Sequence, residues 1–182
     1  MGIRIGVLAL LCGAAAMTVT AQDVSRPSPS FSVQRVGAPA IPLSQYRGKI
    51  LVVAFINTTC PHCQALTRVL TPIANEYAPR GVQFLECAFD EGAQAAVPLF
   101  IQQYAPSFPV GWSTREAVMA YFQVSVMDTR PFYVPHMVFV DKAGIIRGDY
   151  PGESGFFQNA EVNIRAELDK LLKAGTTASK KK

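Results

Sequence analysis

The stretch that decides the fold is I-L-V-V-A-F-I-N-T-T-C-P-H-C, residues 50–63. Its apolar, partly β-branched opening predicts a strand covered on both faces, as in a mostly parallel sheet. Cys60 then stands at the expected first turn of a helix, beside Pro61, where the missing N–H of proline costs nothing. Unpaired backbone N–H groups and the positive end of the helix dipole stabilise a thiolate at such a position. The stretch therefore predicts a reactive cysteine at a strand-to-helix junction.

Cys60 and Cys63 form a C-x-x-C motif. Disulfide exchange needs an accessible thiolate that attacks and a second thiol that resolves the mixed disulfide, and Cys63 is expected one turn deeper than Cys60. A half zinc site is less favoured, because Cys87, His62 and His136 are the only further thiol or imidazole ligands outside the N-terminal apolar run. A purely structural disulfide would close a loop too short to stabilise much. The spacing predicts a redox-active pair without metal or cofactor.

His62 lies between the two cysteines. Its charge or partial charge is expected to stabilise the thiolate and to make the disulfide more oxidising. The alternative is an exposed histidine without a role. We favour the tuning role because groups this close to the sulfur act on it most strongly.

The rest of the chain alternates apolar strands with amphipathic helices. Further strands are expected over residues 82–89, 108–112, 136–141 and 145–150, and helices after Cys60, near 97–104, 114–122 and 164–175. Prolines and a glycine within residues 37–42 predict irregular structure there. Alternating strands and helices imply parallel pairing, and the hairpin around residues 142–144 adds an antiparallel edge. The pattern predicts one α/β domain with a central mixed sheet flanked by helices.

The termini differ from this domain. Residues 1–21 combine a cationic start, an apolar run and small residues before a cleavage point, which predicts a signal peptide. The run is short for a membrane span, although an uncleaved anchor is the alternative. We expect a flexible leader over 22–35, the domain over 36–175 and a disordered basic tail over 176–182. The alternation of apolar and polar residues over 31–36 also fits a short edge strand. Export would place the thiol pair in a periplasm or similar space.

The formal net charge of +4 gives no sign of nucleic-acid binding. Lys180–Lys182 and Arg4 account for all of it, so the body of the chain is close to neutral.

The motif V-V-A-F ahead of C-P-x-C, the segment F-V-D-K-x-G after Pro135, and Gly37-x-Pro39 upstream resemble the thioredoxin superfamily. The similarity is greatest to its exported TlpA/ResA-like branch, related to the AhpC/TSA group, and covers residues 36–172. The resemblance implies a thioredoxin-like fold, Cys60 as nucleophile and Cys63 as resolving thiol. It also implies Pro135 as the family's cis-proline, with Val134 and Pro61 facing a substrate chain.

The activity that this resemblance implies is thiol–disulfide oxidoreduction. Its expected partners are protein thiols and disulfides, together with a membrane redox partner that recycles the pair. The mature protein is expected to be a soluble monomer.

Ala54 and the Pro61-His62 dipeptide depart from the family pattern. Ala54 stands where thioredoxins carry a buried aspartate that assists proton transfer, so an acid must come from elsewhere. Glu91 falls near a functional glutamate of ResA-like proteins and is predicted as a proton relay, with a solvated loop carboxylate as the alternative. The Pro-His dipeptide between the cysteines resembles that of DsbA-like oxidases, whereas the scaffold resembles that of TlpA-like reductases. The direction of electron flow therefore stays open.

Three alternatives concern the remaining cysteine and histidine chemistry. A Sco-like copper protein would use Cys60, Cys63 and His136, but Sco proteins space their cysteines by three residues. A peroxiredoxin needs a proline and a threonine where this chain has Val53 and Asn57. Cys87, in a predicted buried strand, is expected to act as a small apolar residue, with a regulatory disulfide as the alternative.

Overall fold

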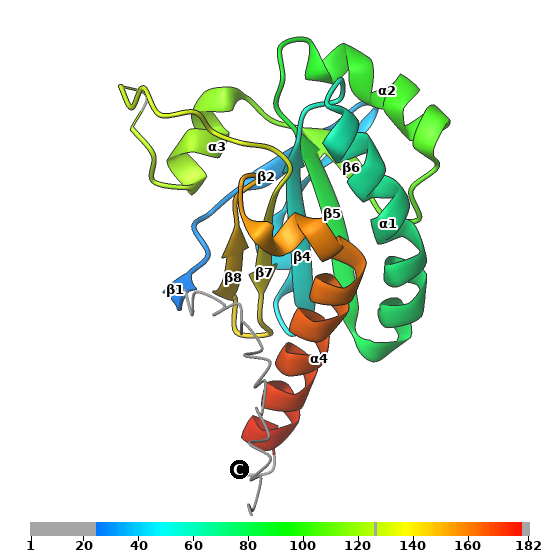
Figure 1. Ribbon diagram of the computed structural model, residues 1–182, viewed down its shortest axis with the longest axis vertical. Helices are drawn as coiled ribbons and strands as arrows, with labels where there is room; N and C mark the ends of the chain where they lie inside the picture. The colour runs from blue at the N-terminus through cyan, green and yellow to red at the C-terminus, as the bar shows by residue number, and fades with distance from the viewer. Residues whose placement is uncertain (1–24, 126, 180–182) are drawn as a thin grey trace, which may run out of the picture.

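The structure is a computed structural model that describes residues 25–125 and 127–179 (Figure 1). Within these residues, eight strands form one sheet in the order β1-β8-β7-β4-β5-β6-β2-β3. The strands are β1 (Arg26–Pro27), β2 (Ser32–Arg35), β3 (Ala38–Pro42), β4 (Ile50–Ile56), β5 (Val82–Ala88), β6 (Val110–Trp112), β7 (His136–Val140) and β8 (Ile145–Tyr150). The helices are α1 (Pro61–Tyr77), α2 (Ala93–Tyr104), α3 (Arg115–Tyr121) and α4 (Ala160–Ser179), with short 3₁₀ turns η1 (Leu43–Tyr46), η2 (Ala78–Arg80) and η3 (Gly155–Asn159).

Strand β4 lies in the middle of the sheet and is buried along its whole length. It pairs in parallel with β5 and antiparallel with β7, and β5 pairs in parallel with β6. Strand β8 extends β7 as the expected hairpin. The predicted α/β class with a mixed central sheet is confirmed, and the strand before the cysteines is its buried centre.

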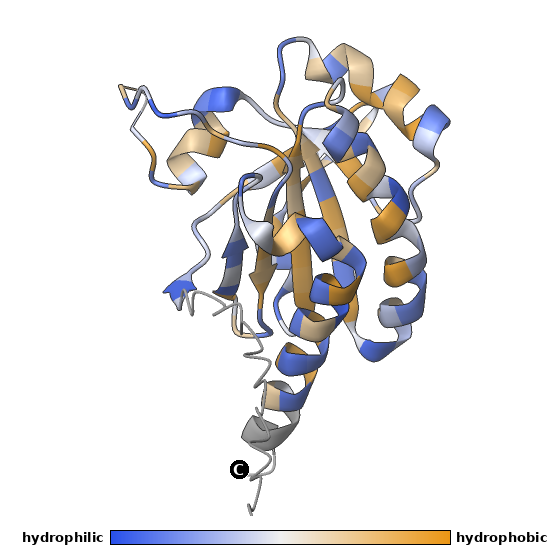
Figure 2. Ribbon diagram, viewed as in Figure 1, coloured by the Kyte–Doolittle hydropathy of each residue, from blue (hydrophilic) through white to orange (hydrophobic). Residues whose placement is uncertain are grey.

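The two faces of the sheet carry separate cores. Helices α1, α2 and α4 cover one face, where Val52 and Ala54 of β4 lie. Helix α3 and η1 cover the other face, which holds Val53 and Phe55 of β4. Figure 1 shows α1 and α2 on the right, α4 running downward from the centre and α3 on the left. The apolar colour of β4 and β5 in Figure 2 agrees with a sheet buried on both sides.

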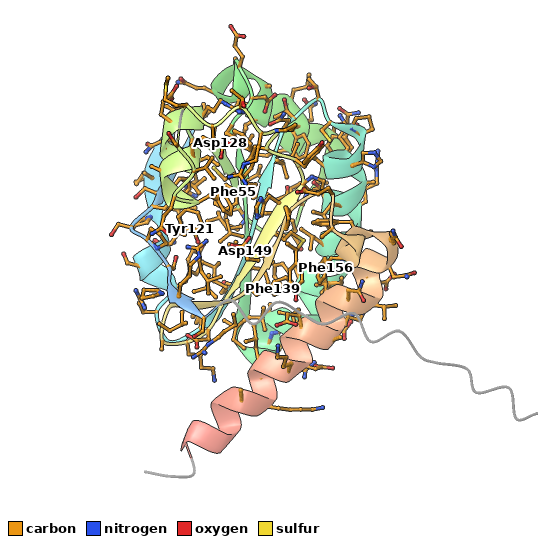
Figure 3. The ribbon with its side chains drawn as sticks, turned by 60° about the vertical axis from the view of Figure 1, so that its left-hand side comes forward. Phe55, Tyr121, Asp128, Phe139, Asp149 and Phe156 are labelled. Atoms are coloured by element: carbon orange, nitrogen blue, oxygen red, sulfur yellow. The ribbon has the colours of Figure 1, made fainter. Side chains whose placement is uncertain are left out.

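Aromatic side chains pack on both faces. On the α3 face, the ring of Phe55 lies 5.2 Å from that of Tyr121, measured between centroids. On the α4 face, Phe139 lies 5.9 Å from Phe156. Figure 3 shows these two pairs to either side of the sheet. Such pairs contribute stabilisation beyond that of the apolar area that each ring buries.

The flexible leader expected over residues 22–35 is wrong for its described part, residues 25–35. The strand expected within residues 31–36 is present as β2, although it lies between β6 and β3 rather than at the edge of the sheet. Strand β1 pairs with β8, and β2 pairs with both β3 and β6. Val33 is fully buried in the core of the α3 face, and Arg26 forms an ion pair of 3.0 Å with Asp149. Burial of Val33 and these backbone pairings order a segment whose Ser- and Pro-rich composition suggested otherwise.

The irregular structure expected over residues 37–42 is also wrong. Strand β3 runs back along β2 after a turn at Gly37, whose φ of 68° is readily adopted by glycine. Pro39 and Pro42 are tolerated because β3 is the outermost strand, and an edge strand can leave one side of its backbone unpaired.

At the C-terminus, α4 continues to Ser179, so the disordered tail expected from residue 176 is wrong for residues 176–179. Helix α4 extends beyond the end of the sheet in Figure 1. The predicted signal peptide and residues 180–182 lie outside the described residues. Among the helices that the structure describes, none has the length and apolar character of a membrane span.

Candidate active site

The C-x-x-C motif lies where β4 passes into α1. Cys60 is the N-cap residue of α1 and has extended backbone, and Pro61 occupies the first turn. Cys60 is half-buried, whereas Cys63 is fully buried under the helix, and both are free thiols. His62 is exposed. An accessible thiol one helical turn from a buried one is the arrangement that stepwise disulfide exchange requires.

A polar clasp fixes the loop in front of Cys60. Asp90, just after β5, accepts hydrogen bonds from the backbone N–H of Thr58 at 2.9 Å and from its hydroxyl at 2.5 Å. Gln64 of α1 donates to the carbonyl oxygen of Thr58 at 2.9 Å. Thr58 is buried, so these bonds satisfy groups that would otherwise lose water without replacement. The clasp ties the start of α1 to the ends of β4 and β5.

The segment ahead of β7 lies against the cysteines. The Val134–Pro135 peptide bond is cis, and the Cys60 sulfur lies 4.0 Å from the carbonyl oxygen of Val134. Gly152 packs closely against this backbone. A Cβ atom at Gly152 would lie only 3.0 Å from backbone atoms of Val134, so a side chain there would push the Val134 backbone aside. The structure thus brings Cys60, Val134 and Pro135 together.

A groove of about 470 Å³ starts at this point. Its walls combine apolar residues of α1 with the Val134–Pro135 segment and the region around η3. The lining includes His62, Leu66, Val69, Val134, Pro135 and Phe157. A partly apolar groove next to a thiol suits a peptide chain better than a small polar ligand.

The buried thiol has a buried carboxyl as its neighbour. Burial raises the pKa of Cys63 well above the ordinary value, and contact with the Cys60 thiol and the nearby charge of Glu86 act in the same direction. Glu86 of β5 is fully buried, and its burial raises its pKa to about 8. Thr67 of α1, also fully buried, hydrogen-bonds to Glu86 at 2.9 Å and to the carbonyl oxygen of Cys63 at 3.1 Å.

Sequence reasoning missed Glu86. The available signal was a lone charged residue inside V-Q-F-L-E-C-A-F, a run otherwise expected to be a buried strand. Buried carboxyls are rare and need partners, so that contrast alone marked the position. Glu91, predicted as the relay, is exposed on the turn after β5.

His136 follows Pro135 but serves a different cluster. Its Nε2 lies 2.6 Å from a carboxylate oxygen of Asp149, and its ring packs against those of Phe122 and Phe132. Burial acts to raise the pKa of Asp149, but the hydrogen bond with His136 and the charge of Arg26 outweigh it, so the pKa is lowered. Within the described residues, no three His, Cys, Asp or Glu side chains are grouped as a metal would require.

Cys87 lies on the face of the sheet opposite Cys63. Cys63 belongs to the core under α1, and Cys87 to the core under α3. Cys87 is fully buried, and burial raises the pKa of its thiol far above the ordinary value. This placement agrees with a small apolar residue that keeps its proton.

Comparison with known families decides the assignment. The model of the AhpC/TSA family matches residues 24–148, a stretch that includes both cysteines, Glu86 and Pro135. The chain belongs to the AhpC/TSA family. The match starts close to β1, which agrees with an ordered segment ahead of residue 36.

Curated relatives of this AhpC/TSA-family chain include thiol-disulfide oxidoreductases named ResA. The protein from Bacillus thuringiensis subsp. konkukian is 24% identical over 158 residues, covering 82% of this chain and 87% of the relative. A protein from Bacillus cereus is 25% identical over 134 residues, covering 69% of this chain and 77% of the relative.

Solved structures show the same fold. A thiol:disulfide interchange protein of the thioredoxin family from Chlorobium tepidum TLS superposes with a TM-score of 0.64 at 22% identity, covering 81% of this chain and 97% of that one. A thiol:disulfide interchange protein from Bacteroides sp. gives a TM-score of 0.64 at 15% identity, covering 82% and 90%. The predicted TlpA/ResA-like member of the thioredoxin superfamily, and its class as a thiol–disulfide oxidoreductase, are confirmed.

Proposed function

We propose that this chain is an exported enzyme that exchanges disulfides with protein substrates through the C-P-H-C pair. The observation that carries the proposal is the placement of the two thiols, with half-buried Cys60 at the start of α1 and Cys63 buried one turn later. In the reducing direction, the Cys60 thiolate attacks a substrate disulfide and forms a mixed disulfide. Cys63 then attacks the Cys60 sulfur, which releases the substrate thiol and leaves the Cys60–Cys63 disulfide.

The residues around Cys60 have supporting roles. The carbonyl of Val134, 4.0 Å from the Cys60 sulfur, offers a backbone group with which an extended substrate can pair. Pro135 and Pro61 shape the two sides of the approach, and the groove beside His62 receives the neighbouring substrate residues. Exposed His62 acts on the Cys60 thiolate as a nearby polar group.

The site of action in this proposal is the periplasm or a comparable compartment. The N-terminal sequence of residues 1–21 supports it through its signal-peptide pattern. An oxidising compartment supplies thiols and disulfides in substrate proteins, and turnover needs a membrane redox partner that restores the pair. The protein acts as a monomer in this scheme.

Cysteine variants test the activity. With insulin as a disulfide-bonded model substrate and dithiothreitol as reductant, Cys60→Ser should abolish reduction. Cys63→Ser should accumulate a mixed disulfide on Cys60 that is detected by mass spectrometry. Cys87→Ser should keep the activity, because Cys87 lies on the opposite face of the sheet. Undiminished reduction by Cys60→Ser would refute the proposal.

The direction of electron flow follows from the reduction potential of the pair. We expect a value towards the oxidising end, about −120 mV, rather than about −270 mV, because His62 stabilises the thiolate form. Equilibration with glutathione buffers measures it. A potential at or below the thioredoxin value would reverse the expected direction and make the chain a reductase.

The copper-binding alternative gains no support from the geometry. Its third ligand would be His136, whose Nε2 is engaged by Asp149 and whose ring packs against Phe122 and Phe132, in the core on the face of the sheet opposite Cys63. Titration of the reduced protein with Cu(I) separates the two functions. Tight stoichiometric binding without disulfide exchange would favour the copper protein.

A further inference from the structure

We propose that Glu86 is the proton partner of the resolving thiol Cys63. In this role Glu86 accepts the proton when Cys63 attacks the mixed disulfide, and returns it when Cys63 is released. The inference rests on the proposed function and deepens it by naming the group that makes the buried thiol reactive.

The sheet register places Glu86 beside Ala54. Ala54 of β4 and Glu86 of β5 are paired Cα partners in parallel strands. Paired residues in neighbouring strands direct their side chains to the same face of a sheet. Ala54 belongs to the core under α1, as does Cys63. The carboxyl therefore comes from the adjacent strand and faces the same helix.

Thr67 connects the Glu86 carboxyl to the backbone of Cys63. Thr67 lies one turn after Cys63 on α1, and its hydroxyl is 3.1 Å from the Cys63 carbonyl oxygen. The same hydroxyl is 2.9 and 3.1 Å from the two oxygens of Glu86. A hydroxyl has one proton to donate, so it cannot fully satisfy all three oxygens. If Glu86 is protonated, it donates to Thr67, and Thr67 donates to the Cys63 carbonyl, which satisfies the chain of bonds.

The protonated state at rest also follows from burial. The hydrogen bonds of Glu86 within the described residues come from Thr67, a neutral group, and burial raises the pKa of Glu86 to about 8. The charge of Glu86 in turn raises the pKa of Cys63. Because a negative charge on either of these two buried groups raises the pKa of the other, the pair is expected to keep at least one proton.

The proton transfer balances in both directions. During resolution, Cys63–SH and the ionised fraction of Glu86 become Cys63–S⁻ and protonated Glu86. The thiolate attacks the Cys60 sulfur, the Cys60–Cys63 bond forms, and the substrate sulfur leaves as a thiolate that takes a proton from water. In reverse, an incoming thiolate attacks Cys60, and the departing Cys63 takes back the proton from Glu86. In the forward direction, the Cys60–Cys63 dithiol is oxidised as the substrate disulfide is reduced, and in the reverse direction the opposite holds.

A two-step reaction of the thiols separates resolution by Cys63 from the first attack by Cys60. The reduced full-length protein is mixed with one molar equivalent of the aromatic disulfide DTNB. Attack by Cys60 releases a first thionitrobenzoate, and resolution by Cys63 releases a second. In Glu86→Gln we expect the first release to stay within about twofold of wild type. The second should slow by about tenfold or more at pH 8 and lose its rise with pH around this value, because the proton acceptor is missing.

Glu116→Gln is the matched control, since Glu116 is an exposed glutamate of α3, the helix that covers the face of the sheet opposite Cys63. Both of its releases should match wild type. A second release in Glu86→Gln with the wild-type rate and pH profile would overturn the inference. Absence of the first release in wild type would instead overturn the proposed function, and the inference with it.

A measurement on the wild type covers the case in which Glu86→Gln does not fold. The protein is labelled with ¹³C-glutamate, and the Glu86 Cδ shift is followed by NMR through a pH titration in both redox states. We expect a midpoint well above the ordinary value of 4.5 in the dithiol form, and a different midpoint in the disulfide form. An ordinary midpoint that is the same in both states would overturn the inference.

Discussion

Glu86 carries an acidic group inside a core otherwise built from aliphatic and aromatic side chains. Its folded-state pKa of about 8 lies above the value of 4.5 expected for a free glutamate. The folded protein therefore binds this proton more tightly than the unfolded chain does. The contribution to stability is complete below the unfolded pKa and is lost as the pH rises through the folded pKa.

We therefore expect the free energy of unfolding of wild type to fall by on the order of a few kcal/mol between about pH 5 and pH 8. Glu86→Gln should remove most of this slope, because an amide does not titrate. Urea denaturation at several pH values measures it, with Glu91→Gln expected to follow wild type. An equal slope in Glu86→Gln would assign the effect to other groups.

His62 is the other residue whose effect can be separated. It is exposed next to Cys60, so its replacement should change the stability of the thiolate and leave the packing unchanged. We expect His62→Ala to lower the reduction potential by about 30 mV or more, equivalent to about 1.4 kcal/mol. Thr59→Ala, an exposed change on the other side of Cys60, is the control. Equal potentials for wild type and His62→Ala would contradict the tuning role.

At the scale of elements, the junction of β4, α1 and β5 depends on the clasp between Thr58 and Asp90. Thr58→Val keeps the shape of the side chain but leaves the second oxygen of Asp90 without its hydroxyl donor. We expect a loss of about 1–3 kcal/mol in the free energy of unfolding, the usual effect of an unsatisfied polar group. Thr59→Val at the exposed neighbouring position should change it by less than about 0.5 kcal/mol. Chemical denaturation of both variants decides, and equal stabilities would show that the clasp contributes little.

The elements also show what sequence can predict. Helix α1 followed from local periodicity, because it buries one continuous face. Strands β4 and β5 followed from their apolar runs, because both faces of each strand are largely buried. Strand β3 did not, because its two prolines are acceptable only on an edge strand, which is a property of the sheet.

The candidate site also has a part that sequence predicts and a part that it does not. The C-x-x-C pair is local in sequence and was predicted. The proximity of Glu86 to Cys63 depends on the register between β4 and β5. The pairing of His136 with Asp149 depends on β7 and β8, whose register shifts near Phe139. Sequence alone fixes neither register.

At the scale of the whole molecule, the N-terminal segment is part of the core rather than a leader. Val33 of β2 is fully buried, whereas Val36, just after the strand, is 53% exposed. We expect Val33→Ala to lower the free energy of unfolding by about 2–3 kcal/mol, through lost burial and an unfilled cavity. Val36→Ala should stay within about 0.5 kcal/mol of wild type. Thermal or urea unfolding distinguishes the two variants, and similarly small effects of both would support the prediction of a flexible leader.

Gly152 has a consequence for how such an enzyme can diversify. It belongs to the segment between β8 and η3, yet a Cβ atom there would lie 3.0 Å from backbone atoms of Val134. A methyl group at this position would therefore press on the backbone whose carbonyl lies beside the Cys60 sulfur. We expect such a change to act on the approach of a substrate chain. A residue far from the cysteines in sequence can in this way alter which protein substrates reach them.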